Sequence, residues 1–224
     1  MLKRALILLL FISFHVLLHS QGSFEPTTHV GVHGGMNLNT VSFNPALKQD
    51  LLPVSTFGIF FRHVSEPNIG LQLEINLSEK GWTEEIDSVR SYTRRIETLT
   101  VPVMAAFIAG KHTVRFAFTI GPYVSYRLRE KETGVPDVFY RQTQNGFEIV
   151  NTKPHFTKPL SSKWEFGYTG GLAFEFHTRI GVFALRASYS HAQTNMFSLN
   201  DYKYYFSGSK QQVIHAGLMY FITF

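Results

Sequence analysis

Cysteine is absent from this sequence of 224 residues. Its absence excludes a disulfide-stabilised scaffold and leaves no thiol near the N-terminus to carry a lipid anchor. Long apolar runs are equally scarce, because no segment after residue 18 has the roughly 20 apolar residues of a membrane-spanning helix. A membrane-embedded form of this chain must therefore be a closed β-barrel, in which every backbone polar group is paired within the protein.

Charge of one sign is also limited. The formal charge is +5, and loss of the two cations Lys3 and Arg4 with an N-terminal segment leaves +3, spread along the sequence. This balance is too mild for nucleic acid to be an expected partner. The length suits a single domain.

The N-terminus carries the one long apolar run. Lys3 and Arg4 precede an apolar stretch at residues 5–18, and Ser20 follows it as a small residue near which cleavage can occur. This order predicts a signal peptide at residues 1–20 and one exported domain at residues 21–224.

Apolar and polar residues alternate repeatedly in the exported part, which is the period of a β-strand with one apolar face. The clearest segments are residues 69–77, 114–127 and 165–176, and fainter ones are residues 29–38, 55–63, 95–107, 180–189 and 211–224. Phe60 and Phe221 are exceptions, because they fall on the polar face of their strands. We therefore predict an all-β fold, an eight-stranded antiparallel up-and-down transmembrane β-barrel.

The connections between these segments alternate in length. Short ones lie at residues 64–68, 109–112 and 178–179, and long ones at residues 39–54, 78–94, 130–163 and 191–210. In a meander every second connection lies at the same rim, so the short and long connections gather at opposite ends. Short periplasmic turns and long outer loops are typical of outer-membrane barrels.

The polar faces of the strands are rich in Gly, Ala, Ser and Thr, which suit the narrow interior of an eight-stranded barrel. They also carry six charged residues that we expect inside the barrel: Glu74, Arg115, Arg127, Glu165, Glu175 and Arg186. Arginine at the lipid midplane costs about 2–4 kcal/mol, which favours an inward position. Trp82 and Trp164 fall near the long-loop ends of their strands, where we expect an aromatic belt.

The sequence indicates no catalytic, cofactor-binding or metal-binding residue. His29 and His33 share a strand face but stand about 13 Å apart at a rise of about 3.3 Å per residue, too far to share a metal. Ser188 and Ser190 share a face near the long-loop rim, and no histidine of that strand joins them on that face. A dyad formed across neighbouring strands stays open at this point.

Two long connections hold candidate contact residues. In the third, Asn145 and Gly146 predict a tight hairpin, with Phe139, Tyr140 and Arg141 on one arm and edges open to a partner strand. The fourth holds Tyr202, Tyr204, Tyr205 and Phe206. Exposed aromatic residues of this kind suit protein or glycan contacts, and the alternative is that they fold over the barrel mouth or join the aromatic belt.

Several short motifs of the chain are familiar from one group of proteins. They are residues 31–38 (GVHGGMNL), 58–60 (GIF), 70–75 (GLQLEI), 78–82 (SEKGW), 99–103 (LTVPV) and 121–123 (GPY). The chain resembles the outer-membrane β-barrel family of Bacteroidetes-type bacteria that is often labelled PorT-like, and the resemblance is weaker after the third long connection. Thr100 stands where members often carry Glu, and residues 217–224 (GLMYFITF) resemble a C-terminal assembly signal.

The resemblance implies the fold and an outer-membrane location, but no single role, because the family is functionally heterogeneous and only one branch is tied to protein secretion and gliding. We expect a non-enzymatic barrel without cofactors that contacts outer-membrane lipid and binds an envelope protein or a surface glycan, or serves as an accessory subunit of an envelope complex. The alternatives are a lipid-modifying outer-membrane enzyme and a soluble, lipocalin-like carrier of a small apolar ligand.

Overall fold

The structure is a computed structural model that describes residues 24–86, 91–111, 113–134, 138–143, 146–151, 155, 159–197 and 206–224. Its long strands are β1 (Thr27–Asn44), β3 (Leu52–Glu66), β4 (Ile69–Glu85), β5 (Ser91–Lys111), β6 (Val114–Thr133), β9 (Trp164–Thr178), β10 (Gly181–Asn195) and β11 (Gly208–Thr223). Three short strands accompany them: β2 (Gln49–Asp50), β7 (Val138–Thr143) and β8 (Gly146–Asn151).

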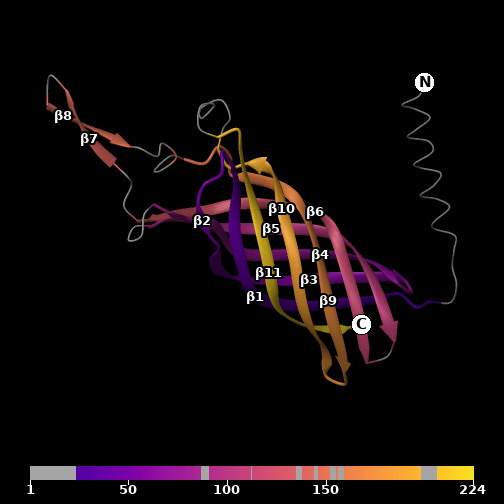
Figure 1. The fold of residues 1–224 in the computed structure, drawn as a ribbon. Coiled ribbons are helices and arrows are strands. Elements are labelled where there is room, and N and C mark those ends of the chain that lie inside the picture. The colour runs from indigo at the N-terminus through magenta and orange to yellow at the C-terminus, as the bar shows by residue number, and fades with distance from the viewer. Residues whose placement is uncertain are drawn as a thin grey trace, which may run out of the picture.

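The eight long strands form a closed antiparallel barrel (Figure 1). Each pairs with its neighbours along the chain, and β6 pairs with β9 because β7 and β8 form a separate two-stranded sheet between them. The first and last strands close the barrel, from His29 opposite Thr223 to Asn44 opposite Gly208. The predicted fold is confirmed.

The strands are longer than the alternation pattern predicts, and β4, β6 and β10 lengthen only toward the long connections. The pairing of β4 with β5 continues from Ser78 opposite Thr98 up to Glu85 opposite Ser91, inside the connection predicted at residues 78–94. Backbone pairing needs no apolar residue, so this part of the wall leaves no apolar alternation in the sequence. The short connections are confirmed as tight turns, for example Pro67–Asn68 and Arg179–Ile180.

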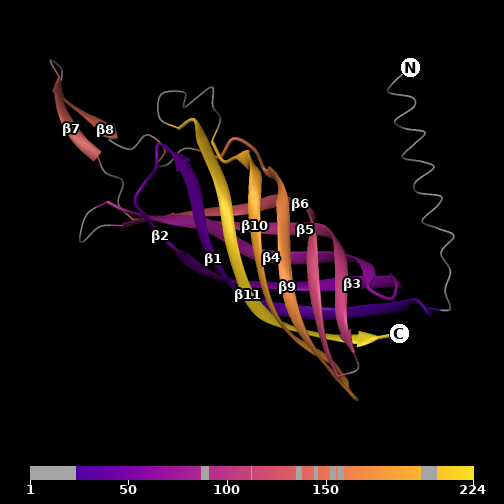
Figure 2. The same cartoon turned by 45° about the vertical axis from the view of Figure 1, so that its right-hand side comes forward.

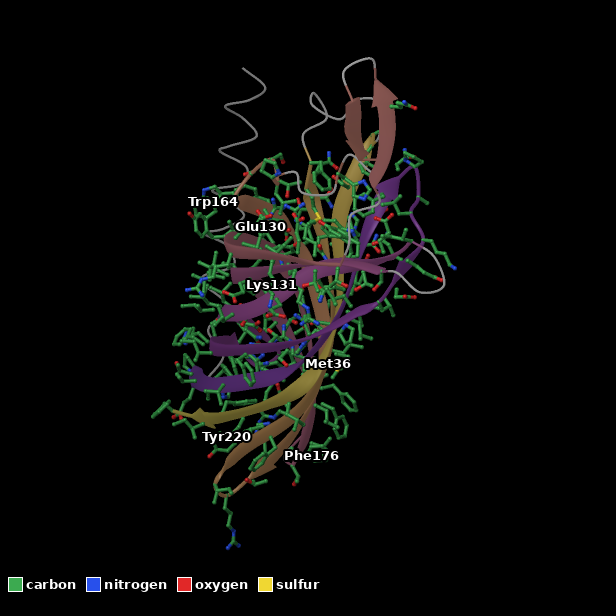
Figure 3. The ribbon with its side chains drawn as sticks, turned by 90° about the vertical axis from the view of Figure 1, so that its left-hand side faces the viewer. Met36, Glu130, Lys131, Trp164, Phe176 and Tyr220 are labelled. Atoms are coloured by element: carbon green, nitrogen blue, oxygen red, sulfur yellow. The ribbon has the colours of Figure 1, made fainter. Side chains whose placement is uncertain are left out.

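The outer surface of the barrel is apolar. Alternate residues of every long strand point outward with large exposed side chains, such as Phe57 at 67% exposure. In Figure 3, Trp164 lies near the long-loop end of the wall, Met36 lies lower, and Tyr220 and Phe176 lie toward the short-turn end. A soluble carrier with an apolar pocket needs the opposite arrangement, so the structure contradicts that alternative.

One tryptophan lies where the aromatic belt was predicted, and the other does not. Trp164 is 51% exposed on the outer surface, whereas Trp82 is fully buried inside the barrel. The belt position for Trp82 was wrong because it considered only height along the strand. Trp82 has the same parity as Glu74 in β4, and strand alternation turns both side chains inward.

The two phenylalanines that interrupt the polar faces of their strands belong to one buried cluster. Phe60 and Phe221 pack inside the barrel with Val182, Ala184 and Met219, near the short-turn rim. Arg62 lies over both rings, at 5.9 Å from the centroid of Phe60 and 5.5 Å from that of Phe221. These side chains occupy the interior between the short-turn rim and the middle of the barrel. The described residues contain no helix long and apolar enough to cross a bilayer.

Candidate functional site

A chain of buried ionic groups crosses the barrel interior above these phenylalanines. Arg62 donates to Glu175 at 2.6 Å and to Gln72 at 2.7 Å, and Gln72 donates to Glu74 at 2.5 Å. Arg186, from the opposite side of the barrel, donates to the same Glu74 oxygen at 2.6 Å. All five side chains are buried. Removing one partner of such a pair is costly, because the other charge stays buried without compensation.

A second ionic group lies nearer the long-loop rim. Lys80 donates to Glu165 at 2.6 Å and to Ser125 at 2.9 Å, and Tyr123 donates to Glu165 at 3.1 Å. Arg127 lies 3.7 Å from the other oxygen of Glu165. These contacts join β4, β6 and β9 across the interior. Strand β5 is joined to them through Thr100, whose hydroxyl is hydrogen-bonded to that of Ser125.

Between the two ionic groups lies a cavity of about 60 Å³, lined in part by Glu74, Lys80, Arg186, His33 and His215. This volume holds a few water molecules. It is far below the roughly 300–1,000 Å³ of a site for a drug-sized ligand. The middle of the interior is therefore largely filled with side chains.

An apolar cluster, here named the closing cluster, fills the interior at the long-loop end. Its members are Val41, Phe43, Trp82, Tyr92, Ile96, Met196, Phe197 and Phe206. The ring of Phe43 lies 5.5 Å from that of Trp82 and 4.7 Å from that of Phe206. His155, from the third long connection, packs on this cluster and bonds to Glu84 at 2.8 Å. The cluster closes the barrel on the side of the long loops.

The first long connection folds back on the wall. Its strand β2 pairs with β4, and Lys48 lies 2.7 Å from Glu85. Hydrogen bonding to Glu85 raises the pKa of the Lys48 ammonium group above its ordinary value.

The six charged residues expected inside the barrel divide into two sets. Glu74, Arg127, Glu165, Glu175 and Arg186 are buried, and each takes part in one of the ionic groups above. Arg115 is half-buried and lines a separate recess at the short-turn rim. The predicted set of interior charges lacks Arg62 and Lys80, although Lys80 shares the strand parity of Glu74 and Arg62 shares that of Phe60. Gln72 lies on the polar face with Glu74, as the alternation predicts.

The candidate contact residues of the loops have different places. Phe139, Tyr140 and Arg141 lie in β7, which pairs with β8 from Val138 opposite Asn151 to Thr143 opposite Gly146. The predicted hairpin is therefore present, and the side chains of these three residues are outside the described part. Figures 1 and 2 both show this β7–β8 ribbon standing away from the barrel.

The fourth long connection is described only in part. Tyr202, Tyr204 and Tyr205 lie outside the described residues. Phe206 is 4% exposed and belongs to the closing cluster, which corresponds to the alternative that these aromatic residues fold over the barrel mouth.

The two serines considered for catalysis have different surroundings. Ser188 lies opposite His215 in register, but His215 is bonded through Nδ1 to Asn37 at 2.9 Å. Ser190 donates to Thr169 at 2.8 Å. In the described part of the chain, no group of three or more histidine, aspartate or glutamate residues is placed to hold a metal ion.

These observations define a closed, side-chain-filled barrel with an apolar outer surface, the architecture of small outer-membrane barrels. The sequence matches the family described as "Outer membrane protein beta-barrel domain" over residues 20–198, and the chain belongs to this family. Family and fold together assign the protein to the outer membrane.

The chain is also similar to several solved structures. Ail of Yersinia pestis is 13% identical, with 88% of this chain and 98% of that chain covered and a TM-score of 0.44. OprG of Pseudomonas aeruginosa is 12% identical, with coverages of 89% and 95% and a TM-score of 0.44. Neisserial surface protein A is 8% identical, with coverages of 86% and 96% and a TM-score of 0.41. A search of curated protein sequences returns no match.

Proposed function

We propose that this outer-membrane barrel is non-enzymatic and acts through its long connections, by binding an envelope protein or a surface glycan, or as an accessory subunit of an envelope complex. The observation that carries the proposal is the filled interior. The closing cluster and the two ionic groups leave a cavity of only about 60 Å³, while the β7–β8 ribbon stands outside the barrel. With its middle and its long-loop end filled by side chains, the barrel has its long connections and outer surfaces left for this function.

A protein partner suits the ribbon best. Within the described residues, β7 and β8 pair only with each other, so each keeps one edge with backbone groups directed outward. Such an edge can accept a further strand, with backbone hydrogen bonds supplying affinity. Two strands alone are marginally stable in water, which favours a partner that extends the sheet.

Three further parts of the proposal rest on the sequence. Residues 1–20 serve as a cleaved signal peptide, and the outward apolar side chains contact outer-membrane lipid. Residues 31–38 and 70–75 support membership of the PorT-like, Bacteroidetes-type group and, within it, a role as an accessory subunit of a secretion complex.

The test replaces residues 138–151 with a short Gly-Ser linker and compares partner capture after gentle detergent extraction. We expect the variant to keep the shift in gel mobility between unheated and heated samples that marks a folded barrel, and to lose the proteins recovered with the native chain. Unchanged recovery would contradict a role for the ribbon. As a matched control, Arg129→Gln changes an exposed side chain of β6 and keeps the ribbon. A changed lipid A or phospholipid profile in a deletion strain would favour the enzyme alternative.

A further inference from the structure

A recess of about 440 Å³ lies at the short-turn rim, beside the turn between β9 and β10. Its polar lining includes Arg115, Arg179, His29 and His177. No aspartate or glutamate lines it among the described residues. This recess, named here the rim recess, is therefore cationic.

The positive charge of the rim recess is not neutralised from within. Glu175 stands opposite Arg115 in register, but its carboxylate accepts a hydrogen bond from Arg62 at 2.6 Å and lies 3.7 Å from His177. In the described part of the chain, neither Arg115 nor Arg179 has an ion-pair partner. Two guanidinium groups at one rim suit a phosphate group, whose oxygens accept paired hydrogen bonds from arginine.

An apolar concavity of about 780 Å³, named here the outer groove, lies on the outside of the wall. Its lining includes the exposed side chains of Val32, Phe57, Ile59, Leu77, Leu185 and Leu218. Gly34 also lines it and adds no side chain of its own. A groove of this composition at membrane depth suits a hydrocarbon chain.

The rim recess and the outer groove lie close to each other at the end of β11. Tyr220 borders the groove, and Ile222, two residues further on the same outward face, borders the recess. The Tyr220 hydroxyl donates to the carbonyl oxygen of Ile180, another residue of the recess, at 2.6 Å. Figure 3 shows Tyr220 and Phe176 together at this end of the barrel. A cationic pocket thus lies beside an apolar groove.

We propose that the two together hold one phospholipid of the inner leaflet, with its phosphate against Arg115 and Arg179 and an acyl chain along the outer groove. The short-turn rim faces the periplasm, so the rim recess lies at the height of the inner-leaflet headgroups, and the outer groove lies on the wall further from that rim, at the height of the acyl chains. Basic pockets beside membrane-spanning elements recognise lipid headgroups by this combination of charge and apolar surface. The proposal is independent of any partner bound by the long connections.

The experiment is native mass spectrometry of the full folded chain in a mild detergent with three probes added in turn. The probes are a phosphatidylethanolamine, the diacylglycerol with the same acyl chains, and inorganic phosphate. We expect one phosphatidylethanolamine to be retained per chain, with at least tenfold lower retention of the other two. Equal retention of the diacylglycerol would overturn the role of the rim recess, and retention of phosphate alone would reduce it to a site for soluble anions and overturn the lipid proposal.

Two variants test the two sites separately. Arg115→Gln removes a cation of the recess, and Gly34→Leu places a side chain in the groove, where the new Cβ lies 3.0 Å from the exposed ring of Phe57. Each is expected to lower retention about tenfold, whereas Arg129→Gln at the far end of β6 leaves it unchanged. Gel mobility before and after heating shows whether each variant folds, and Arg179→Gln replaces Arg115→Gln if that variant does not. Wild-type retention in both folded variants would overturn the proposal.

Discussion

The middle of the barrel interior and its long-loop end are filled by opposite chemistry. The middle holds buried ion pairs such as Glu74–Arg186 and Lys80–Glu165, whereas the end holds the aromatic and aliphatic side chains of the closing cluster. The ion pairs join strands that lie across the barrel from each other and so fix their relative positions. The closing cluster instead gathers residues from strands and long connections. The ionic layer therefore sets the relative positions of the strands, and the closing cluster seals the long-loop end of the barrel.

The largest effect is expected in the closing cluster. Trp82→Ala removes a fully buried indole that touches Phe43 and Phe197, and truncation of a buried tryptophan costs about 3–5 kcal/mol. Urea unfolding of the barrel in detergent measures this change. Trp164→Ala, on the outer surface, is the matched control and is expected to cost under about 1 kcal/mol. Equal losses for both tryptophans would contradict the inward position of Trp82.

The ionic layer is expected to respond almost as strongly. Glu74→Gln leaves Arg186 buried beside a neutral amide, and breaking a buried pair costs about 3 kcal/mol or more. Combining it with Arg186→Met removes the orphaned charge, so the double variant is expected to regain much of the loss. Urea unfolding of the single and double variants gives the coupling. Additive losses would show that the two side chains act independently.

Outside the interior the same kind of charge pair is expected to matter little. Arg95 and Glu79 lie 3.2 Å apart with both side chains exposed to solvent. Arg95→Ala is expected to change stability by under about 0.5 kcal/mol, because exposed ion pairs contribute little and are screened by salt. The measurement is again urea unfolding, at low and high salt. A loss comparable to that of Glu74→Gln would remove the distinction between interior and surface pairs.

The smallest effect concerns conductance. The native chain is expected to show no large, stable single-channel current in a planar bilayer, and Phe43→Ala is expected to show none either, because the ionic layer still fills the barrel below the closing cluster. A stable current in the variant alone would mean that the closing cluster is the only seal. A stable current in the native chain would contradict a filled interior altogether.

The barrel itself was predictable because period-two alternation and unequal connections are local signals. Segments such as residues 69–77 reveal both the strand and its inward face, including Glu74. The extra length of the strands was not predictable, since residues such as Thr83 and Thr93 pair through the backbone without an apolar pattern. The inward position of Trp82 was predictable, because it follows from the strand parity that Trp82 shares with Glu74.

The partners inside the barrel were beyond the reach of the sequence. Arg62 and Glu175 are 113 residues apart in the chain. Their contact depends on the stagger between β3 and β9, which face each other across the barrel interior. The same holds for Phe206 and Phe43, which come together only when a long connection folds over the barrel mouth.

The length of β5 and β6 determines how far the barrel wall rises above the membrane. A strand of 21 residues tilted by about 40° rises about 50 Å, whereas the apolar band of such barrels is about 25 Å tall. Roughly half of this hairpin therefore extends above the bilayer as part of the barrel wall. The β7–β8 ribbon follows β6 in the chain, so this raised part of the wall holds the ribbon well away from the membrane surface.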